Sequence, residues 1–381
     1  MILLNKKNLS QRLYVIFSHY LDKAAFPGAA VGISLWNGSI YNNFISHYGL
    51  AQYSPIRISL TRKTVFDLAS LTKPLATVPA LLSLMTEGKL SWNSNLGQIF
   101  PGKIPEYKKN ITIQQLMSHC SGLPAHREYF KKLFKMKECD RKKLLFTWIA
   151  EEKLVYPPGT NFVYSDLGFM LLGLIIEKVS AKSLEEYIEK KIYKPLGLYS
   201  SLFFAEKRKE KGKVYAATSL CPWTAEMLSG RVHDDNCRAL GGVGGHAGLF
   251  GTIDGVVQWC EHLLSQIKGR ESHPSYGNEI LRKAVTKEDS SPWTSGFDTP
   301  SGVGSSSGKF FSPSSFGHLG YTGTSFWIDP QKEVIIVLLT NRVHQGINNE
   351  LIKKFRPLFH DTVMACLQTE KNKKNPCIMN A

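Results

Sequence analysis

Residues 67–76 read DLASLTKPLA, and the expected fold follows from the serine and lysine that this stretch places three positions apart. Ser70 and Lys73 fall on one face of a helix, because positions i and i+3 are neighbours on a helical surface. Pro74 has no backbone N–H and is tolerated in the first turn, so the helix is predicted to begin close to Ser70. The stretch therefore predicts a nucleophile and its base at the positive end of a helix dipole.

The same Ser-x-x-Lys spacing occurs twice more in the chain, in surroundings that do not favour a site. The pattern places Ser265 on the polar side of a surface helix. Ser306 lies in GVGSSSGK, which is too rich in Gly and Ser to hold a helix. After Ser70, by contrast, residues 75–90 continue as an apolar helix that Gly88 is expected to end. The copy at Ser70 is therefore the candidate.

Length and composition indicate a large globular protein of one large or two interleaved domains. No run approaches the roughly 18 to 20 apolar residues of a membrane span, and residues 1–21 carry charges where a secretory signal needs an apolar core. This favours a cytoplasmic protein, with the periplasm or cell envelope as the alternative. The sequence leaves the oligomeric state open.

The formal net charge of +16 raises the question of nucleic-acid binding. Much of the excess lies in short lysine-rich runs that are predicted to be solvated loops and a tail, at 131–143, 206–213 and 370–375. Because the charge is scattered and forms no continuous patch, nucleic acid is not an expected partner. Attraction to an anionic cell-envelope polymer stays open.

Cysteine and histidine positions do not predict a metal or cofactor site. The odd number of cysteines without metal-binding spacing favours reduced thiols, at Cys120, Cys139, Cys221, Cys237, Cys260, Cys366 and Cys377. His233, Asp234, Asp235 and His246 stand among glycines, which predicts a tight loop in place of a metal site. His119, in SHCSGLP, is expected to brace a loop. No cofactor is expected.

Hydrophobic periodicity predicts a sheet built from both ends of the chain. After an amphipathic helix at 9–24, strands are expected at 28–36 and 40–49, and near the end at 323–330 and 333–341 before a final helix. We expect residues 1–67 and 236–381 to form one α/β sheet domain. Residues 68–235 are predicted to form a mainly helical domain, and residues 294–317 a long loop.

Two later stretches supply polar groups that could complete a serine site. Tyr164 and Asp166 precede an apolar helix in PPGTNFVYSDLGFMLLG, and His318 and Gly320 lie in the glycine-rich FGHLGYTGTSFWIDP. A serine nucleophile needs a proton carrier for the leaving group and donors for an oxyanion. These stretches are the candidates for both.

In their joint order, SLTK, YSD and HLG resemble the Ser-x-x-Lys, Tyr-x-Asn and Lys-Thr-Gly motifs of the serine β-lactamase and penicillin-binding protein superfamily, in its class C-like branch. The resemblance covers residues 24–345. It implies an α+β, β-lactamase/transpeptidase-like fold, in which an antiparallel sheet is flanked by helices on both faces and the active site lies between the sheet and a mainly helical domain. It also implies a serine acyl hydrolase that works through a covalent acyl-enzyme.

The resemblance assigns roles to individual residues. Ser70 would attack a carbonyl carbon, and Lys73 and Tyr164 would pass the proton to the leaving group. The backbone N–H groups of Ser70 and Tyr321 would form the oxyanion hole. A free phenol has a pKa near 10, so Tyr164 would depend on the cation of Lys73 to lose its proton.

Asp166, His318, Gly320 and Tyr321 would contact the substrate, and two of these positions depart from the family motifs. Asp166 replaces Asn; it would pair with Lys73, raise the pKa of that lysine and oppose its role as base. Alternatively, it caps the following helix. His318 replaces Lys and would attract a substrate carboxylate weakly, unless it is a structural histidine. Efficient β-lactam hydrolysis is therefore not expected.

The predicted partner is a small acyl substrate, that is, a cell-wall peptide, an ester or a β-lactam. The leading hypothesis is an activity like that of a D-alanyl-D-alanine carboxypeptidase or an esterase, with weak β-lactamase activity. The alternative is a non-catalytic member of the fold that binds cell-wall fragments or acts as a scaffold.

Overall fold

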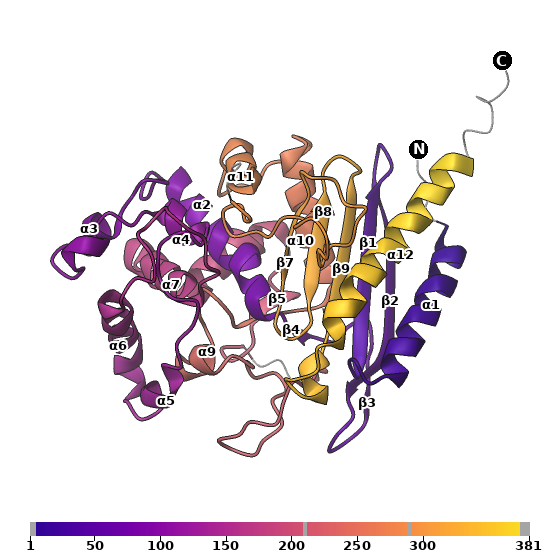
Figure 1. Ribbon diagram of the computed structural model, residues 1–381, viewed down its shortest axis with the longest axis horizontal. Coiled ribbons are helices and arrows are strands. Elements are labelled where there is room, and N and C mark those ends of the chain that lie inside the picture. Colours follow the sequence, from indigo (N-terminus) through magenta and orange to yellow (C-terminus); the bar gives the residue numbers. More distant parts are fainter. Residues whose placement is uncertain (1–4, 209–211, 288–290, 374–381) are drawn as a thin grey trace.

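The computed structural model describes residues 5–208, 212–287 and 291–373. A twisted sheet with helices on both faces lies beside a mainly helical part, as Figure 1 shows. The fold is α+β, as expected. The helices are α1 (Lys6–Asp22), α2 (Val78–Thr86), α3 (Leu96–Ile99), α4 (Ile113–Met117), α5 (Phe130–Leu133), α6 (Glu138–Glu151), α7 (Asp166–Ser180), α8 (Leu184–Ile188), α9 (Asp235–Ala239), α10 (Ile253–Ile267), α11 (Asn278–Val285) and α12 (Leu351–Lys373).

The main sheet has six antiparallel strands in the order β3-β2-β1-β9-β8-β7. Both ends of the chain contribute, because β1 pairs with β2 on one side and with β9 on the other. The expectation that strands from both ends of the chain join one antiparallel sheet is therefore confirmed. The strands are β1 (Gly28–Trp36), β2 (Tyr41–Gln52), β3 (Ile58–Ser59), β7 (Phe316–Leu319), β8 (Ser325–Asp329) and β9 (Val334–Thr340).

Side chains of the central strand β9 alternate between two separate cores. Ile336 and Leu338 pack in the core that α1 and α12 cover. Ile335 and Val337 belong to the core that α10 and the helical part share. Successive strand residues point to opposite faces, so an almost continuous apolar run fills both cores at once.

A second, small sheet joins the helical part to the main sheet just before the candidate serine. Its order is β4-β6-β5, with β4 (Phe66–Asp67), β5 (Leu202–Phe204) and β6 (Leu249–Gly251). The domain limits expected from the sequence stay a prediction. Within the described ranges, no helix combines the length and the apolar character that a bilayer crossing requires.

The helix expected after Ser70 begins irregularly. A 3-10 turn covers Ala69–Leu71, a π-turn covers Lys73–Thr77, and only then does α2 begin. Pro74 and Pro79 remove two amide donors, and the chain closes the π-turn with the Val78 N–H bonding to the Lys73 carbonyl. The prediction of an α-helical first turn at Ser70 was therefore wrong, although Gly88 ends α2 with φ 71° as expected.

The expected position of Ser265 was also wrong. Its residue is 5% exposed in α10 and its hydroxyl lies 2.9 Å from that of Tyr41, so it packs inside the molecule. Ser306 lies in the long loop before β7, as expected, although the last two residues of the predicted loop belong to that strand.

The described cysteines include buried thiols that burial makes unreactive. Burial raises the pKa of Cys237 and Cys260 well above the usual range of a thiol. No disulfide joins these two to another described residue. Cys377 lies outside the described residues.

Candidate active site

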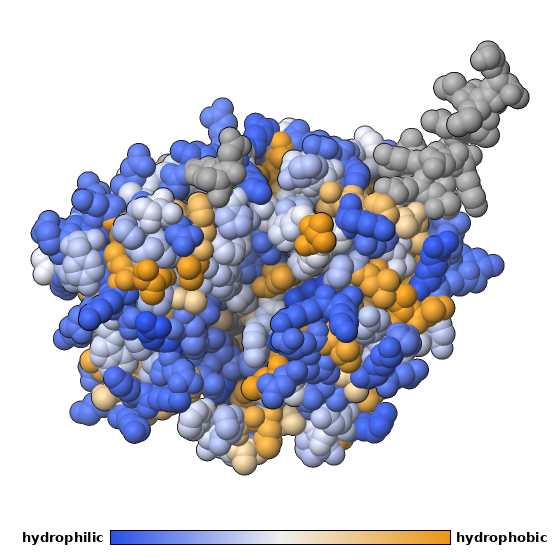
Figure 2. Space-filling model, viewed as in Figure 1, coloured by the Kyte–Doolittle hydropathy of each residue, from blue (hydrophilic) through white to orange (hydrophobic). Residues whose placement is uncertain are grey.

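A cavity of about 700 Å³ opens between the helical part and the sheet. Ser70, Tyr164, Asp166 and Tyr321 all line it. On the face shown in Figure 2, a hollow separates the same two parts of the molecule. The fold thus brings residues from three distant motifs to one cavity.

The backbone before Ser70 is held in a strained conformation. Ala69 has φ 48°, which non-glycine residues rarely adopt. The Ala69 N–H donates to the Asp67 carboxylate at 2.9 Å, and the Thr72 hydroxyl donates to the Ala69 carbonyl at 2.6 Å. Burial raises the pKa of Asp67 to about 6. These bonds on both sides hold Ser70 at the cavity wall.

Lys73 is buried behind Ser70 and is an ammonium ion. Its Nζ lies 3.2 Å from Ser70 Oγ, 2.7 Å from Asp166 Oδ1 and 3.3 Å from the His246 carbonyl oxygen. Burial alone would lower the pKa of Lys73, but the charge of Asp166 and the nearby Tyr164 outweigh it, so the pKa is raised. The expected pairing with Asp166 is confirmed, and the resting amine cannot accept a proton.

Asp166 is a carboxylate at the first position of α7. Burial would raise its pKa, but the charge of Lys73 and the nearby His126 lower it well below the usual range. His126 Nδ1 lies 3.8 Å from Asp166 Oδ2, on the solvent side of the pair. The alternative interpretation of Asp166 as the helix cap was wrong, because the side chain of Ser165 accepts from the Gly168 N–H and caps α7.

Tyr164 is oriented by His119, which braces the loop as expected. His119 Nδ1 accepts the Ser165 N–H at 3.1 Å, and its ring centroid lies 4.5 Å from that of Tyr164. Burial raises the pKa of Tyr164, although the charge of Lys73 acts against this. The Lys73 Nζ lies 4.8 Å from the Tyr164 ring centroid. The resting phenol is therefore neutral.

The turn between β7 and β8 lies directly against the serine segment. The Thr322 hydroxyl donates to the Asp67 carbonyl at 2.8 Å, and the Thr324 hydroxyl donates to the Leu68 carbonyl at 3.2 Å. A Cβ on Gly320 would lie 2.0 Å from Thr324 Oγ1 and 2.8 Å from the Leu68 oxygen. Only glycine fits at this close approach, which holds the turn that carries Tyr321 against the backbone just before Ser70.

His318 does not reach the cavity wall with the other candidate residues. It is buried, and its Nδ1 lies 2.8 Å from the Leu319 carbonyl oxygen, to which a protonated Nδ1 would donate. Burial and the nearby Lys73 lower the pKa of His318 to about 3. Its ring lies 6.0 Å from that of Tyr164. His318 is thus an uncharged neighbour behind the tyrosine.

The sequence did not indicate several residues that line the cavity. His126, Leu220 and Ile347 all line it, and the last two are 58% and 52% exposed at its mouth. No motif marks these positions, and only the fold brings them together. Asp234 also lines the cavity; its Oδ1 caps α9 and lies 3.0 Å from His246 Nε2.

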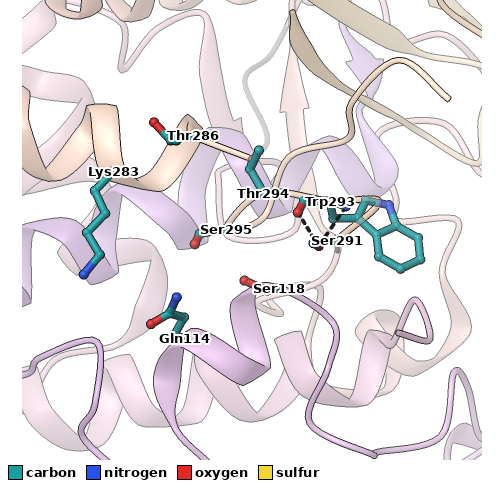
Figure 3. Close-up of a pocket in the computed structure, with 8 residues that line it drawn as sticks. All are labelled: Gln114, Ser118, Lys283, Thr286, Ser291, Trp293, Thr294 and Ser295. Atoms are coloured by element: carbon teal, nitrogen blue, oxygen red, sulfur yellow. Dashed lines mark hydrogen bonds between the residues drawn. The ribbon is translucent and has the colours of Figure 1, made fainter. Parts of the chain in front are cut away.

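A smaller pocket of about 120 Å³, drawn in Figure 3, shares no lining residue with this cavity. Lys283 and Thr286 reach it from the end of α11, Gln114 and Ser118 from α4 and the residue after it. Trp293 lines this pocket and also approaches the site, since its ring lies 5.3 Å from that of His119 and 6.2 Å from that of Tyr164. The other lining residues of the pocket carry polar side chains, and they do not include Ser70 or Lys73.

Comparison with known proteins agrees with this geometry. The β-lactamase family model matches residues 15–353, which is most of the chain. The chain belongs to the β-lactamase family. As a member of this family it is an enzyme, a serine hydrolase of the type that includes β-lactamases and penicillin-binding proteins.

Relatives in the family carry the names of cell-wall enzymes. The chain is 32% identical over 320 residues to a "Putative D-alanyl-D-alanine carboxypeptidase" of Escherichia coli (strain K12), covering 76% of this chain and 72% of the relative. It is 31% identical over 352 residues to an N-acetylmuramyl-L-alanine amidase of Bacillus subtilis (strain 168), covering 85% and 79%. A solved class C β-lactamase shares the fold, with a TM-score of 0.70 and 18% identity, covering 96% of this chain and 99% of that one.

Proposed function

We propose that this protein hydrolyses an amide or ester bond of a cell-wall fragment through a covalent acyl-enzyme on Ser70. One observation carries the proposal: a buried lysine nitrogen lies 3.2 Å from the hydroxyl oxygen of a serine at the wall of a large cavity. A hydroxyl placed against a candidate base in a partly enclosed site is the arrangement that nucleophilic catalysis requires.

The route of the serine proton is set by the ion pair. Lys73 is already protonated, so Nζ must release a proton before it accepts the one on Ser70. The Asp166 oxygen 2.7 Å away is the nearest acceptor. Transfer between them would leave a neutral amine and a neutral carboxyl group. Because Asp166 strongly favours its charged form, this transfer is uphill, and we expect slow acylation.

The oxyanion would be held by the backbone N–H groups of Ser70 and Tyr321. Both residues line the cavity, and within the described chain neither amide donates a recorded hydrogen bond elsewhere. Each donor of this kind contributes about a hundredfold to a thousandfold in rate. Tyr164, on the other side of Ser70, would return the proton to the leaving group.

The substrate class follows from the relatives and from the charge of the third motif. Both named relatives are cell-wall enzymes, which makes a peptide amide of the cell wall the first substrate to test. Uncharged His318 offers little attraction to a terminal carboxylate. We therefore place esters and carboxyl-blocked amides beside the D-alanyl peptide, and expect β-lactam hydrolysis to be weak. The cytoplasmic location expected from the sequence stays a prediction.

The alternative of a non-catalytic binding protein does not stand, because the family to which the chain belongs is one of enzymes. Acylation of Ser70 is the step to test, since the resting Lys73 is protonated and cannot act directly as a base. We expect a fluorophosphonate to label the wild-type protein and not Ser70→Ala. Ser306→Ala, which changes a serine of the same spacing in the long loop, is the control and should label normally.

A fluorescent penicillin refines the outcome. Labelling by both reagents indicates a penicillin-binding enzyme, whereas labelling by the fluorophosphonate alone indicates an esterase. No labelling of the folded wild-type protein by either reagent would contradict the proposed acyl-enzyme on Ser70.

A further inference from the structure

A buried arginine of α12 donates hydrogen bonds to the turn that carries Tyr321. Arg356 is 7% exposed, and its Nη2 donates to the Gly320 carbonyl at 2.9 Å and to the Thr324 carbonyl at 2.8 Å. These two carbonyls bracket the β7–β8 turn. No motif in the sequence marks Arg356, and it does not line the cavity.

Burying the charged side chain of Arg356 is energetically unfavourable, which argues against a purely structural role. Among the described residues no carboxylate lies within ion-pair distance of it, and its Nε is buried without a hydrogen-bond partner. Asp298 attracts it from further away. A buried cation without a paired anion is unfavourable, and an apolar side chain of similar size would often pack as stably. Its presence therefore calls for a role that an apolar side chain cannot perform.

The Gly320 carbonyl belongs to the same peptide unit as the Tyr321 N–H. A peptide unit is planar, so its C=O and N–H point in opposite directions. A cation bound to the oxygen draws electron density from the nitrogen and strengthens the N–H as a donor. It also prevents a flip that would turn the carbonyl into the cavity.

The second peptide of the oxyanion site has an equivalent support. The Ser70 N–H shares a peptide unit with the Ala69 carbonyl, which accepts the Thr72 hydroxyl at 2.6 Å. A neutral hydroxyl supports one peptide and a guanidinium supports the other. Charge-assisted hydrogen bonds are the stronger class, so the contribution of Arg356 is the larger of the two.

We propose that Arg356 is a positioning residue for acyl transfer, which orients and polarises the 320–321 peptide so that the Tyr321 N–H stabilises the oxyanion formed when Ser70 attacks. This rests on the proposed acyl-enzyme function. It assigns a role in the reaction to a residue outside the three motifs and outside the cavity.

The test compares Arg356→Met and Arg356→Lys with the wild-type protein on a p-nitrophenyl ester and on its thiono analogue, in which sulfur replaces the carbonyl oxygen. Active sites are titrated with a fluorophosphonate. The methionine variant should fold, because the Gly320 carbonyl still accepts the Gly323 N–H and the Thr324 carbonyl still accepts the Gly320 N–H. Arg141→Met is the matched control, since Arg141 likewise donates to the Ala239 and Met136 carbonyls, away from the turn.

We expect kcat of Arg356→Met on the oxygen ester to fall about 10- to 100-fold per active site with KM changed less than about threefold. Arg356→Lys should recover part of the loss. For the same variant, kcat on the thiono ester should fall less than kcat on the oxygen ester, because sulfur accepts hydrogen bonds weakly. The ratio of kcat on the oxygen ester to kcat on the thiono ester therefore decreases. If Arg356 had a merely structural role, its replacement would lower kcat on both substrates by the same factor and leave this ratio unchanged.

Three outcomes count against the proposal. Equal losses on the two substrates, or a methionine variant within about threefold of the wild-type kcat, would overturn the role of Arg356 alone. A wild-type protein without Ser70-dependent acylation would overturn the proposed function and this role with it.

Discussion

Replacing Asp166 with asparagine tests the charge state that the structure assigns to the site. Asp166 Oδ1 lies 2.7 Å from the Nζ of Lys73, whose side chain is completely buried, while the aspartate side chain is 20% exposed. With an effective dielectric constant of about 20, two unit charges at this distance attract by about 6 kcal/mol. Solvent contact of Asp166 and the remaining dipole of the amide reduce the loss, and we expect about 2 to 3 kcal/mol.

Losing the attraction between Asp166 and Lys73 has opposite consequences for the stability of the protein and for the reactivity of Ser70. Without the carboxylate, burial favours the neutral amine of Lys73. Each 1.36 kcal/mol makes the neutral amine tenfold more populated, so a loss of about 2 kcal/mol raises fluorophosphonate labelling at pH 7 about thirtyfold if the amine is the base. At the same pH, the free energy of unfolding decreases by about 2 to 3 kcal/mol.

The pH dependence gives the sign of the effect. In the wild type, the raised pKa of Lys73 gives stability that is present below pH 10.5 and lost above it. The lowered pKa of Asp166 gives stability that is present above pH 3.8 and lost below it. The pair therefore contributes constantly between pH 5 and 9. In Asp166→Asn, burial without the carboxylate lowers the pKa of Lys73 below its unfolded value, so stability rises with pH as the pH passes through that lowered pKa.

Urea unfolding and labelling rates measured from pH 5 to 10 check both parts. Asp254→Asn is the control, because the Arg62–Asp254 pair is 61% and 35% exposed and contributes less than about 1 kcal/mol. Slower labelling of Asp166→Asn at every pH would refute the reasoning and make the carboxylate itself the base. A pH-independent stability in this variant would show that Lys73 keeps its charge without Asp166.

Three further predictions concern single features of the site. Gly320→Ala places a Cβ 2.0 Å from Thr324 Oγ1 and 2.8 Å from the Leu68 oxygen. Thermal unfolding should therefore show that the free energy of unfolding falls by about 1 to 3 kcal/mol, and fluorophosphonate labelling should slow at least about tenfold. An unchanged stability and labelling rate would mean that the turn moves freely. The Asp166 carboxylate, 3.8 Å away, raises the pKa of half-exposed His126, which gives stability below about pH 6.5 that is lost as the pH rises through the folded pKa. Urea unfolding between pH 5 and 8 should show this decrease in the free energy of unfolding, of less than about 1 kcal/mol, in the wild type and not in His126→Gln. A decrease that persists in the variant would assign the pH dependence to another group. Dialysis against EDTA should leave labelling unchanged, since we propose a route through side chains alone; a loss restored by a metal ion would contradict it.

Much of the fold followed from local patterns. The strands β1 and β2, the single sheet that both chain ends share, and helix α7 were all predicted, because alternation and helical periodicity are properties of neighbouring residues. The irregular start of the helix after Ser70 was missed, since two prolines act on a hydrogen-bond ladder that periodicity does not describe. The burial of Ser265 was missed because the polar side of one helix meets β2 through Tyr41.

By itself, the sequence determined which residues are candidates for the chemistry, since the order of three motifs and the spacing of Ser70 and Lys73 are written along the chain. The tertiary structure decided their charge states and directions. Lys73 is an ammonium because Asp166, 93 residues away, faces it in a buried site, and His318 is neutral because it is buried. Spacing fixes contacts between near neighbours, whereas pKa values and the orientation of a peptide depend on burial and on groups such as Arg356 that only folding brings near.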